Sequence, residues 1–192
     1  MTLPRLKPWI ALAVVAALQT AVLAWMIIDR TILIKTGKEI VLPVRPVDPR
    51  DLFRGQYVRL GYDVSSVPLR LVEGPRPVGN AAFYVTLEAQ EGGGYVPVRL
   101  TASRPRETGP KQIVLKARTF FRFPTAEQNS SGTVQVRYGI ESYFVPEGEG
   151  PRLEELARDK KLAVLVAVDA KGNAALKGIV IDGKLQYSEQ LL

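Results

Sequence analysis

The sequence of 192 residues contains neither cysteine nor histidine. Without these side chains the chain has no disulfide, no cysteine nucleophile, no Ser-His-Asp triad and no zinc site built from Cys or His ligands. A cysteine-free chain suits the cytosol and the extracytoplasmic space equally well, so the absence does not fix the compartment. We predict no metal, no cofactor and no catalytic residue, and we look for a binding site among acids, arginines and tyrosines.

Long apolar runs are also scarce, with one exception near the amino terminus. Residues 9–28 carry no charge, and about twenty helical residues span the roughly 30 Å of hydrocarbon in a bilayer. Trp9 and Trp25 lie near the two ends, where tryptophan favours the headgroup region. The pattern predicts one transmembrane helix whose first partner is the lipid bilayer. A cleaved secretory signal ending at Ala24 is the alternative, but the apolar run continues through Ile28.

The anchor divides the chain into four predicted parts: a basic tail (1–8), a transmembrane helix (9–28), a linker (29–38) and a domain (39–192). Basic residues flank the helix on both sides, so their number alone does not set the orientation. A short tail before one span and a large domain most often stays in the cytoplasm. We therefore expect the domain to be extracytoplasmic.

The sixteen glycines and fourteen prolines are spread along the chain, which is typical of short strands joined by turns. Alternating apolar residues predict about eight strands, at 39–47, 56–63, 81–89, 95–102, 112–123, 133–145, 162–169 and 174–182. The segment 151–161 is predicted as a helix. The expected fold is mainly β: an antiparallel β-sandwich or partly open barrel with one short helix, preceded by one N-terminal transmembrane helix.

Four of these strands carry three more specific predictions. The two prolines in 39–47 would remove ladder donors, so this segment is expected at a sheet edge. The run Gly92-Gly93-Gly94 predicts a hairpin between 81–89 and 95–102. The segment 162–169 is apolar on both faces and is expected at the centre of a sheet.

A recognisable motif lies at residues 54–62, which read Arg-Gly-Gln-Tyr-Val-Arg-Leu-Gly-Tyr. This stretch resembles the bacterial GDYXXLXY family, which is named for a Gly-Asp-Tyr-x-x-Leu-x-Tyr motif. Gly55, Tyr57, Leu60 and Tyr62 match that motif, whereas Gln56 replaces its aspartate. Residues 46–51 resemble the family's usual lead-in, and 138–148 resemble a second block. The resemblance implies a protein tethered to the bacterial inner membrane and supplies no chemical activity.

The predicted function is a non-catalytic interaction or ligand-binding module that acts with another integral membrane protein. The two motif blocks would form its binding surface. The residues of that surface are Asp48, Arg50, Asp51, Arg54, Gly55, Tyr57, Leu60, Tyr62, Tyr138, Gly139, Glu141, Tyr143, Glu147 and Gly148.

The alternative function is a carboxylate-dependent hydrolase or transferase that uses Asp48, Asp51 and Glu141. It requires two of these carboxylates within about 10 Å of each other across an open cleft. Caps of a turn would account for Asp48 and Asp51 without catalysis.

Basic and aromatic residues leave further alternatives open. Four arginines could pair with the acids, or form a pocket for an anionic ligand, or lie on a solvated strand face: Arg50, Arg54, Arg118 and Arg137. Tyrosines of the motif could stack on a ligand or fill the core. Residues 99–122 hold seven basic residues against one acid. Behind an anchor, attraction to anionic headgroups explains this better than nucleic acid, which is not expected as a partner.

Overall fold

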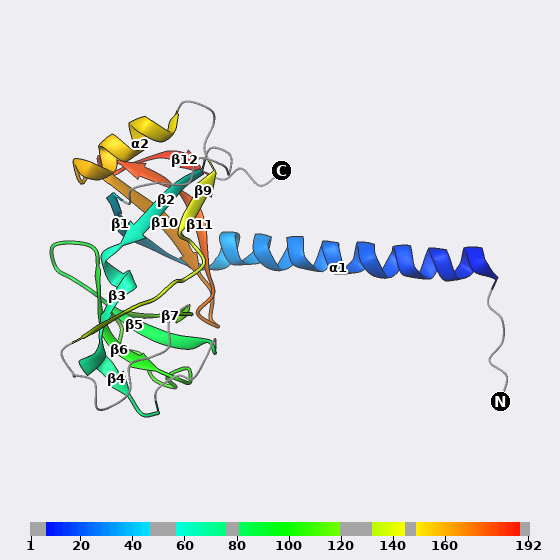
Figure 1. The fold of residues 1–192 in the computed structure, drawn as a ribbon, viewed down its shortest axis with the longest axis horizontal. Helices are drawn as coiled ribbons and strands as arrows, with labels where there is room; N and C mark the ends of the chain where they lie inside the picture. The colour runs from blue at the N-terminus through cyan, green and yellow to red at the C-terminus, as the bar shows by residue number, and fades with distance from the viewer. Residues whose placement is uncertain (1–6, 47–56, 76–80, 120–131, 145–148, 189–192) are drawn as a thin grey trace.

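The computed structural model describes residues 7–46, 57–75, 81–119, 132–144 and 149–188. Within these residues the chain is mainly β, with a long N-terminal helix α1 (Pro8–Thr36) and a short helix α2 (Glu149–Arg158) (Figure 1). The predicted fold class is therefore confirmed. Buried side chains from all three sheets form one continuous hydrophobic cluster, so the strands share a single core.

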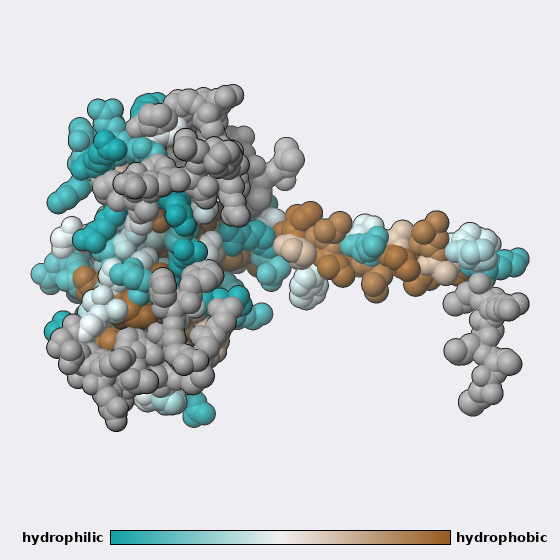
Figure 2. Space-filling model, viewed as in Figure 1, coloured by the Kyte–Doolittle hydropathy of each residue, from teal (hydrophilic) through white to brown (hydrophobic). Residues whose placement is uncertain are grey.

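Helix α1 projects from the strands as a straight rod, and its first turn is farthest from the domain (Figure 1). It includes the predicted span 9–28 and continues through 29–36, most of the segment predicted as a linker. Its side chains are exposed and largely apolar along the rod (Figure 2). Among the described residues, this helix alone is long and apolar enough to cross a membrane, with a mean hydropathy of 2.3.

The larger sheet is antiparallel, curls into a half-barrel, and has the strand order β12-β11-β10-β1-β2-β9. Its strands are β1 (Lys38–Pro46), β2 (Tyr57–Tyr62), β9 (Ser142–Phe144), β10 (Leu162–Val168), β11 (Ala174–Ile181) and β12 (Lys184–Ser188). Strand β10 pairs with β1 on one side and β11 on the other, which confirms its predicted central position. Helix α2 lies over β1, β2 and β10 and buries Leu153 and Ala157 in the core.

The smaller sheet has the order β4-β6-β5-β7 and forms the other lobe of the domain (Figure 1). Its strands are β4 (Val72–Glu73), β5 (Phe83–Ala89), β6 (Tyr95–Thr101) and β7 (Gln112–Ala117). The predicted hairpin of β5 and β6 is confirmed. Strand β3 (Ser66–Pro68) lies between the 3₁₀ turns at Asp63–Ser65 and Leu69–Leu71, and it pairs with β8 (Thr133–Gln135) in a two-stranded ladder.

The prediction that 39–47 is an edge strand is wrong, because β1 lies inside the larger sheet. Its partners divide its length: Lys38–Pro43 pair with β10, and Val44–Pro46 pair with β2. Pro43 and Pro46 each occupy the last position of one of these ladders. A proline at the end of a ladder leaves the hydrogen bonds before it intact, so an interior strand tolerates both.

Residues 133–145 do not form the single strand that their alternation predicts. Strands β8 and β9 are separated by a bend at Gly139, whose φ of 84° belongs to the left-handed region. The alternation itself holds, because Val134, Val136 and Ile140 are buried. Hydrophobic contacts therefore set the faces of this segment, while glycine interrupts its ladder.

Candidate functional site

The first motif block lies on β2, where alternate residues face the core. Leu60 and Tyr62 are both buried, as the alternation predicts. The Tyr62 hydroxyl donates a hydrogen bond of 2.6 Å to the carbonyl oxygen of Ile140. The motif strand is thereby fastened to the second motif block.

The second block makes the reciprocal contact. The hydroxyl of buried Tyr138 donates a hydrogen bond of 2.5 Å to the carbonyl oxygen of Val64. Burial raises the pKa of both Tyr62 and Tyr138, and the negative charge of Glu141 raises each pKa further. Both phenols therefore stay protonated donors that fill the core, which favours the structural role over ligand stacking.

Glu141 shapes the loop between the two tyrosines. Its carboxylate accepts hydrogen bonds from the backbone N–H of Tyr138 at 2.5 Å and of Gly139 at 3.0 Å. Its carbonyl oxygen accepts one from the N–H of Leu60 at 2.9 Å. Both carboxylate oxygens thus hold the backbone in its turn at Gly139.

The predicted motif surface is only partly within the described residues. Leu60, Tyr62, Tyr138, Gly139 and Glu141 come together as described above. Tyr143 lies half-buried on β9, opposite Val58 in the ladder, and Tyr57 pairs through its backbone with Phe144. The remaining predicted residues lie outside the described residues: Asp48, Arg50, Asp51, Arg54, Gly55, Glu147 and Gly148. The alternative function requires two of Asp48, Asp51 and Glu141 to lie close together, and this requirement stays a prediction.

A cavity of about 520 Å³ opens beside this loop, at the end of helix α1. We call it the junction pocket. Its polar lining is Arg30, Lys116, Arg118, Arg137, Glu141 and Asn173, with Tyr138 and Gly139 of the second motif block in its wall. Four cationic residues therefore line the same cavity as one carboxylate, and both oxygens of that carboxylate already accept hydrogen bonds.

Backbone hydrogen bonds bring Lys116, Arg118 and Arg137 to this place. Arg118 and Arg137 exchange both backbone hydrogen bonds, at 2.9 and 2.8 Å. The N–H of Lys116 donates to the carbonyl oxygen of Gly172 at 2.7 Å. At Gly172 a Cβ would lie 3.1 Å from that same nitrogen, and φ is 86°, so only glycine permits this approach without strain.

The turn between β10 and β11 forms another wall. The Asp169 Oδ1 atom accepts hydrogen bonds of 2.8 Å from the backbone N–H of Lys171 and of Asn173, and Oδ2 accepts one from the Asn173 side chain. This is an Asx-type turn, in which a carboxylate replaces backbone partners. The turn orients Asn173 while its own acid is fully engaged.

Helix α1 contributes the fourth wall and is fixed to the sheet. The Arg30 Nη1 atom donates a 3.1 Å hydrogen bond to the carbonyl oxygen of Ala174, and Leu33 and Ile34 bury themselves against Ala175. Gly37 follows the helix, where a Cβ would lie 2.6 Å from the Leu33 carbonyl oxygen and 2.9 Å from the Val168 nitrogen. The helix thus passes into β1 through a tightly packed junction.

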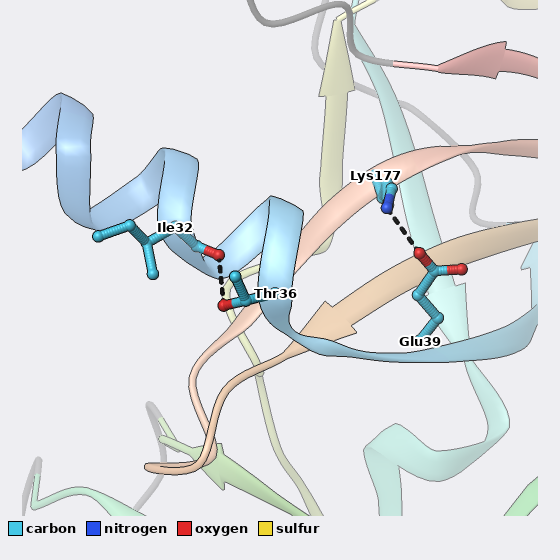
Figure 3. A network of polar contacts seen from close by, with 4 residues as sticks. All are labelled: Ile32, Thr36, Glu39 and Lys177. Carbon is cyan, nitrogen blue, oxygen red and sulfur yellow. Dashed lines mark hydrogen bonds and ion pairs between the residues drawn. The ribbon is translucent and has the colours of Figure 1, made fainter.

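Polar contacts surround the same junction (Figure 3). The Thr36 hydroxyl donates to the carbonyl oxygen of Ile32 at 2.8 Å within the last helical turn. Nearby, Lys177 on β11 forms a 2.6 Å ion pair with Glu39 on β1 across the intervening strand β10. These contacts add to the packing that fixes the helix relative to the sheet.

Sequence reasoning found part of this pocket. Arg118 and Arg137 were candidates for an anion pocket, and the structure brings them together; the proposed companions Arg50 and Arg54 lie outside the described residues. Arg30, Lys116 and Asn173 were missed. Arg30 reaches a carbonyl 144 positions away in the chain, and no local pattern predicts such a contact. Among the described residues, no group of three or more acids is placed to hold a metal ion.

The second motif block, which forms one wall of the pocket, is also where comparison with known proteins is informative. Residues 19–179 match the family described as GDYXXLXY protein. The chain belongs to the GDYXXLXY family. The match confirms the resemblance and includes both motif blocks, the end of α1 and most of the larger sheet. In this GDYXXLXY protein, the Leu and final Tyr of the motif are core residues that position the pocket wall. No curated protein and no solved structure matches the chain.

Proposed function

We propose that this protein is a single-pass protein of the bacterial inner membrane, and that its extracytoplasmic β domain is a non-catalytic binding module. The module would act beside another integral membrane protein, with the junction pocket as its recognition site. The observation that carries the proposal is the convergence of Arg30, Lys116, Arg118 and Arg137 on one cavity at the end of the apolar helix.

The exposed helix supports membrane anchoring. An isolated helix with apolar side chains on every side is stable only where another apolar phase covers it. Its tryptophans Trp9 and Trp25 are 65% and 74% exposed, as expected for rings that enter the interfacial regions of a bilayer.

The junction supports action close to the bilayer. The apolar run ends at Ile28, and Arg30 is already hydrogen-bonded to the domain. Two residues of helix correspond to about 3 Å. With Leu33, Ile34 and Gly37 packed against the sheet, the domain is held at the membrane surface instead of on a flexible tether.

The hydrogen bonds accepted by Glu141 support a binding role for the pocket and not an acid–base role. An acid–base pair needs carboxyl groups that can exchange protons with a substrate. Glu141, the carboxylate among the described lining residues, has each oxygen occupied by a backbone N–H. The pocket therefore offers mainly donors, which suit recognition of an anionic group.

The orientation can be tested because the chain has no cysteine of its own. A single cysteine would be placed at Ser103, an exposed position between β6 and β7, or at Thr2 in the tail. A membrane-impermeant maleimide should label Ser103→Cys in intact spheroplasts and Thr2→Cys only after lysis. The reverse pattern would place the domain in the cytoplasm.

The partner can be tested by site-specific photo-crosslinking. A photo-reactive amino acid at Lys171, an exposed position in the turn beside the pocket, should give a discrete adduct with an integral membrane protein. The matched control is Arg70, an exposed residue in the 3₁₀ turn Leu69–Leu71 of the other lobe. Equal adducts from both positions, or none from Lys171, would contradict the proposal.

A further inference from the structure

The charge of the junction pocket specifies the class of ligand. Arg30, Lys116, Arg118 and Arg137 come from different segments, α1, β7, the residue after β7 and the β8–β9 connection. Arg30 uses one guanidinium nitrogen on Ala174, and an arginine fork still has further N–H donors for an oxyanion. Such a set of donors fits a phosphate group, whose oxygens accept several charge-assisted hydrogen bonds.

The position of the pocket relative to the bilayer indicates the source of that phosphate. The uncharged run 9–28 matches the thickness of the hydrocarbon core, and Arg30 follows it by two residues. Phosphates of phospholipids lie just outside the hydrocarbon. The Arg30 side chain and the wall at Ala174 thus lie at the level of the lipid phosphates when α1 spans the bilayer.

A second cavity points to the same surface. It has a volume of about 440 Å³ and is lined by Thr36 at the end of α1, by Lys38 and Arg104, and by Asp169 at the start of the β10–β11 turn. Asp169 accepts three hydrogen bonds within its turn, and Lys38 and Arg104 outnumber its single negative charge, so this cavity also carries a net positive charge. Cations therefore flank the β10–β11 turn on both sides, close to the end of the helix.

We propose that the junction pocket binds the phosphate of an anionic phospholipid in the leaflet next to the domain. The inference rests on the proposed function, because it requires α1 to span the bilayer with the domain at its surface. The lipid would make one wall of the recognition site, and its binding would depend on Lys116 and the three arginines that line the pocket. A soluble phosphate compound offers the same chemistry but does not explain the position of the pocket at the end of the apolar segment.

The test uses the full-length protein, delipidated in a neutral detergent, with binding measured by native mass spectrometry at constant ionic strength. The probes are phosphatidylglycerol, zwitterionic phosphatidylcholine with the same acyl chains, and inorganic phosphate. We expect phosphatidylglycerol to bind preferentially. Arg118→Gln and Lys116→Gln should each weaken it by about tenfold, the loss expected for one hydrogen bond to a charged group. Arg70→Gln removes an equal charge from the other lobe and should leave the affinity unchanged.

Each possible outcome either supports or overturns the assignment of a lipid phosphate to the junction pocket. Inorganic phosphate that binds as tightly as phosphatidylglycerol would show a site for a soluble anion and would overturn the lipid assignment. Equal loss from Arg118→Gln and Arg70→Gln would show general charge attraction, and also overturn it. The thermal midpoint of each variant confirms that it is folded. Because the Lys171 crosslink is measured separately, a crosslinked partner without specific lipid binding would reject the lipid and leave the proposed function standing.

Discussion

Tyr62 and Tyr138 donate hydrogen bonds in opposite directions across one interface, and each acceptor lies two residues beyond the other tyrosine. The Tyr62 hydroxyl contacts the Ile140 carbonyl oxygen at 2.6 Å, and the Tyr138 hydroxyl contacts the Val64 carbonyl oxygen at 2.5 Å. This reciprocal pair joins the first and second motif blocks of the chain. It also fixes the loop that forms a wall of the junction pocket.

Removing either hydroxyl should destabilise the domain without creating a cavity. In Tyr62→Phe or Tyr138→Phe a buried carbonyl oxygen loses its partner, which typically costs about 1–3 kcal/mol of unfolding free energy. The loss in the double variant should be smaller than the sum, because breaking one bond loosens the interface that holds the other. Chemical denaturation of the detergent-solubilised protein measures both effects. Tyr84→Phe on β5, outside this interface, is the control, and an equal loss there would refute the role assigned to the pair.

The same two phenols predict a loss of stability in alkali. Burial and the charge of Glu141 raise the pKa of Tyr62 and Tyr138 above the ordinary value of 10.0. As the pH rises through about 10, the unfolded chain releases these protons while the folded domain retains them, so stability falls with rising pH. Two protons correspond to a slope of about 2.7 kcal/mol per pH unit. This slope is reached only above about pH 10, so unfolding free energies measured at about pH 9 and about pH 11 should differ by about 2.7 kcal/mol in total. The Tyr62→Phe/Tyr138→Phe double variant should lose most of this difference.

Local pattern predicted the faces of these elements better than their pairing. Alternation placed Leu60, Tyr62 and Tyr138 in the core because burial follows the two-residue period of the backbone. The position of β1 inside the sheet depended on how two partners divide its length, which its prolines alone do not show. Strand β12 was missed, although Asp182-Gly183 is a hairpin signal and both residues have positive φ.

The pocket was predictable only in part, because its residues come together through contacts between distant parts of the chain. Arg118 and Arg137 fall within the predicted strands 112–123 and 133–145, and the sequence therefore indicated them as candidates. Arg30 and Lys116 join them through contacts with the β10–β11 turn, which lies far away in the chain. Long-range contacts of this kind follow from tertiary packing, and no local pattern in the sequence predicts them.

Gly37 should be required for the rigid junction between α1 and the sheet. A methyl group there would lie 2.6 Å from the Leu33 carbonyl oxygen and 2.9 Å from the Val168 nitrogen, both of them backbone atoms that cannot turn away. Gly37→Ala should therefore cost about 1–3 kcal/mol and increase hydrogen exchange at the end of α1 and the adjoining ends of β10 and β11. Gly92→Ala is the matched control, since no atom lies within 4 Å of its added Cβ. Unchanged exchange in Gly37→Ala would contradict a packed junction.

A substitution at Glu141 distinguishes the proposed binding module from the alternative, a carboxylate-dependent hydrolase or transferase. Glu141→Gln keeps one acceptor oxygen and loses the charge, so the bonds to the Tyr138 and Gly139 nitrogens cannot both persist. We expect a loss of about 1–3 kcal/mol in unfolding free energy, with the Lys171 crosslink retained wherever the variant is folded. Stability and crosslinking are measured on the same preparation, below the denaturation midpoint. A general acid or base would behave otherwise, because removing a reactive carboxyl typically leaves the fold intact while abolishing turnover. A Glu141→Gln variant of unchanged stability would thus favour the catalytic role, since the hydrogen bonds that engage this carboxylate would then contribute nothing to the fold.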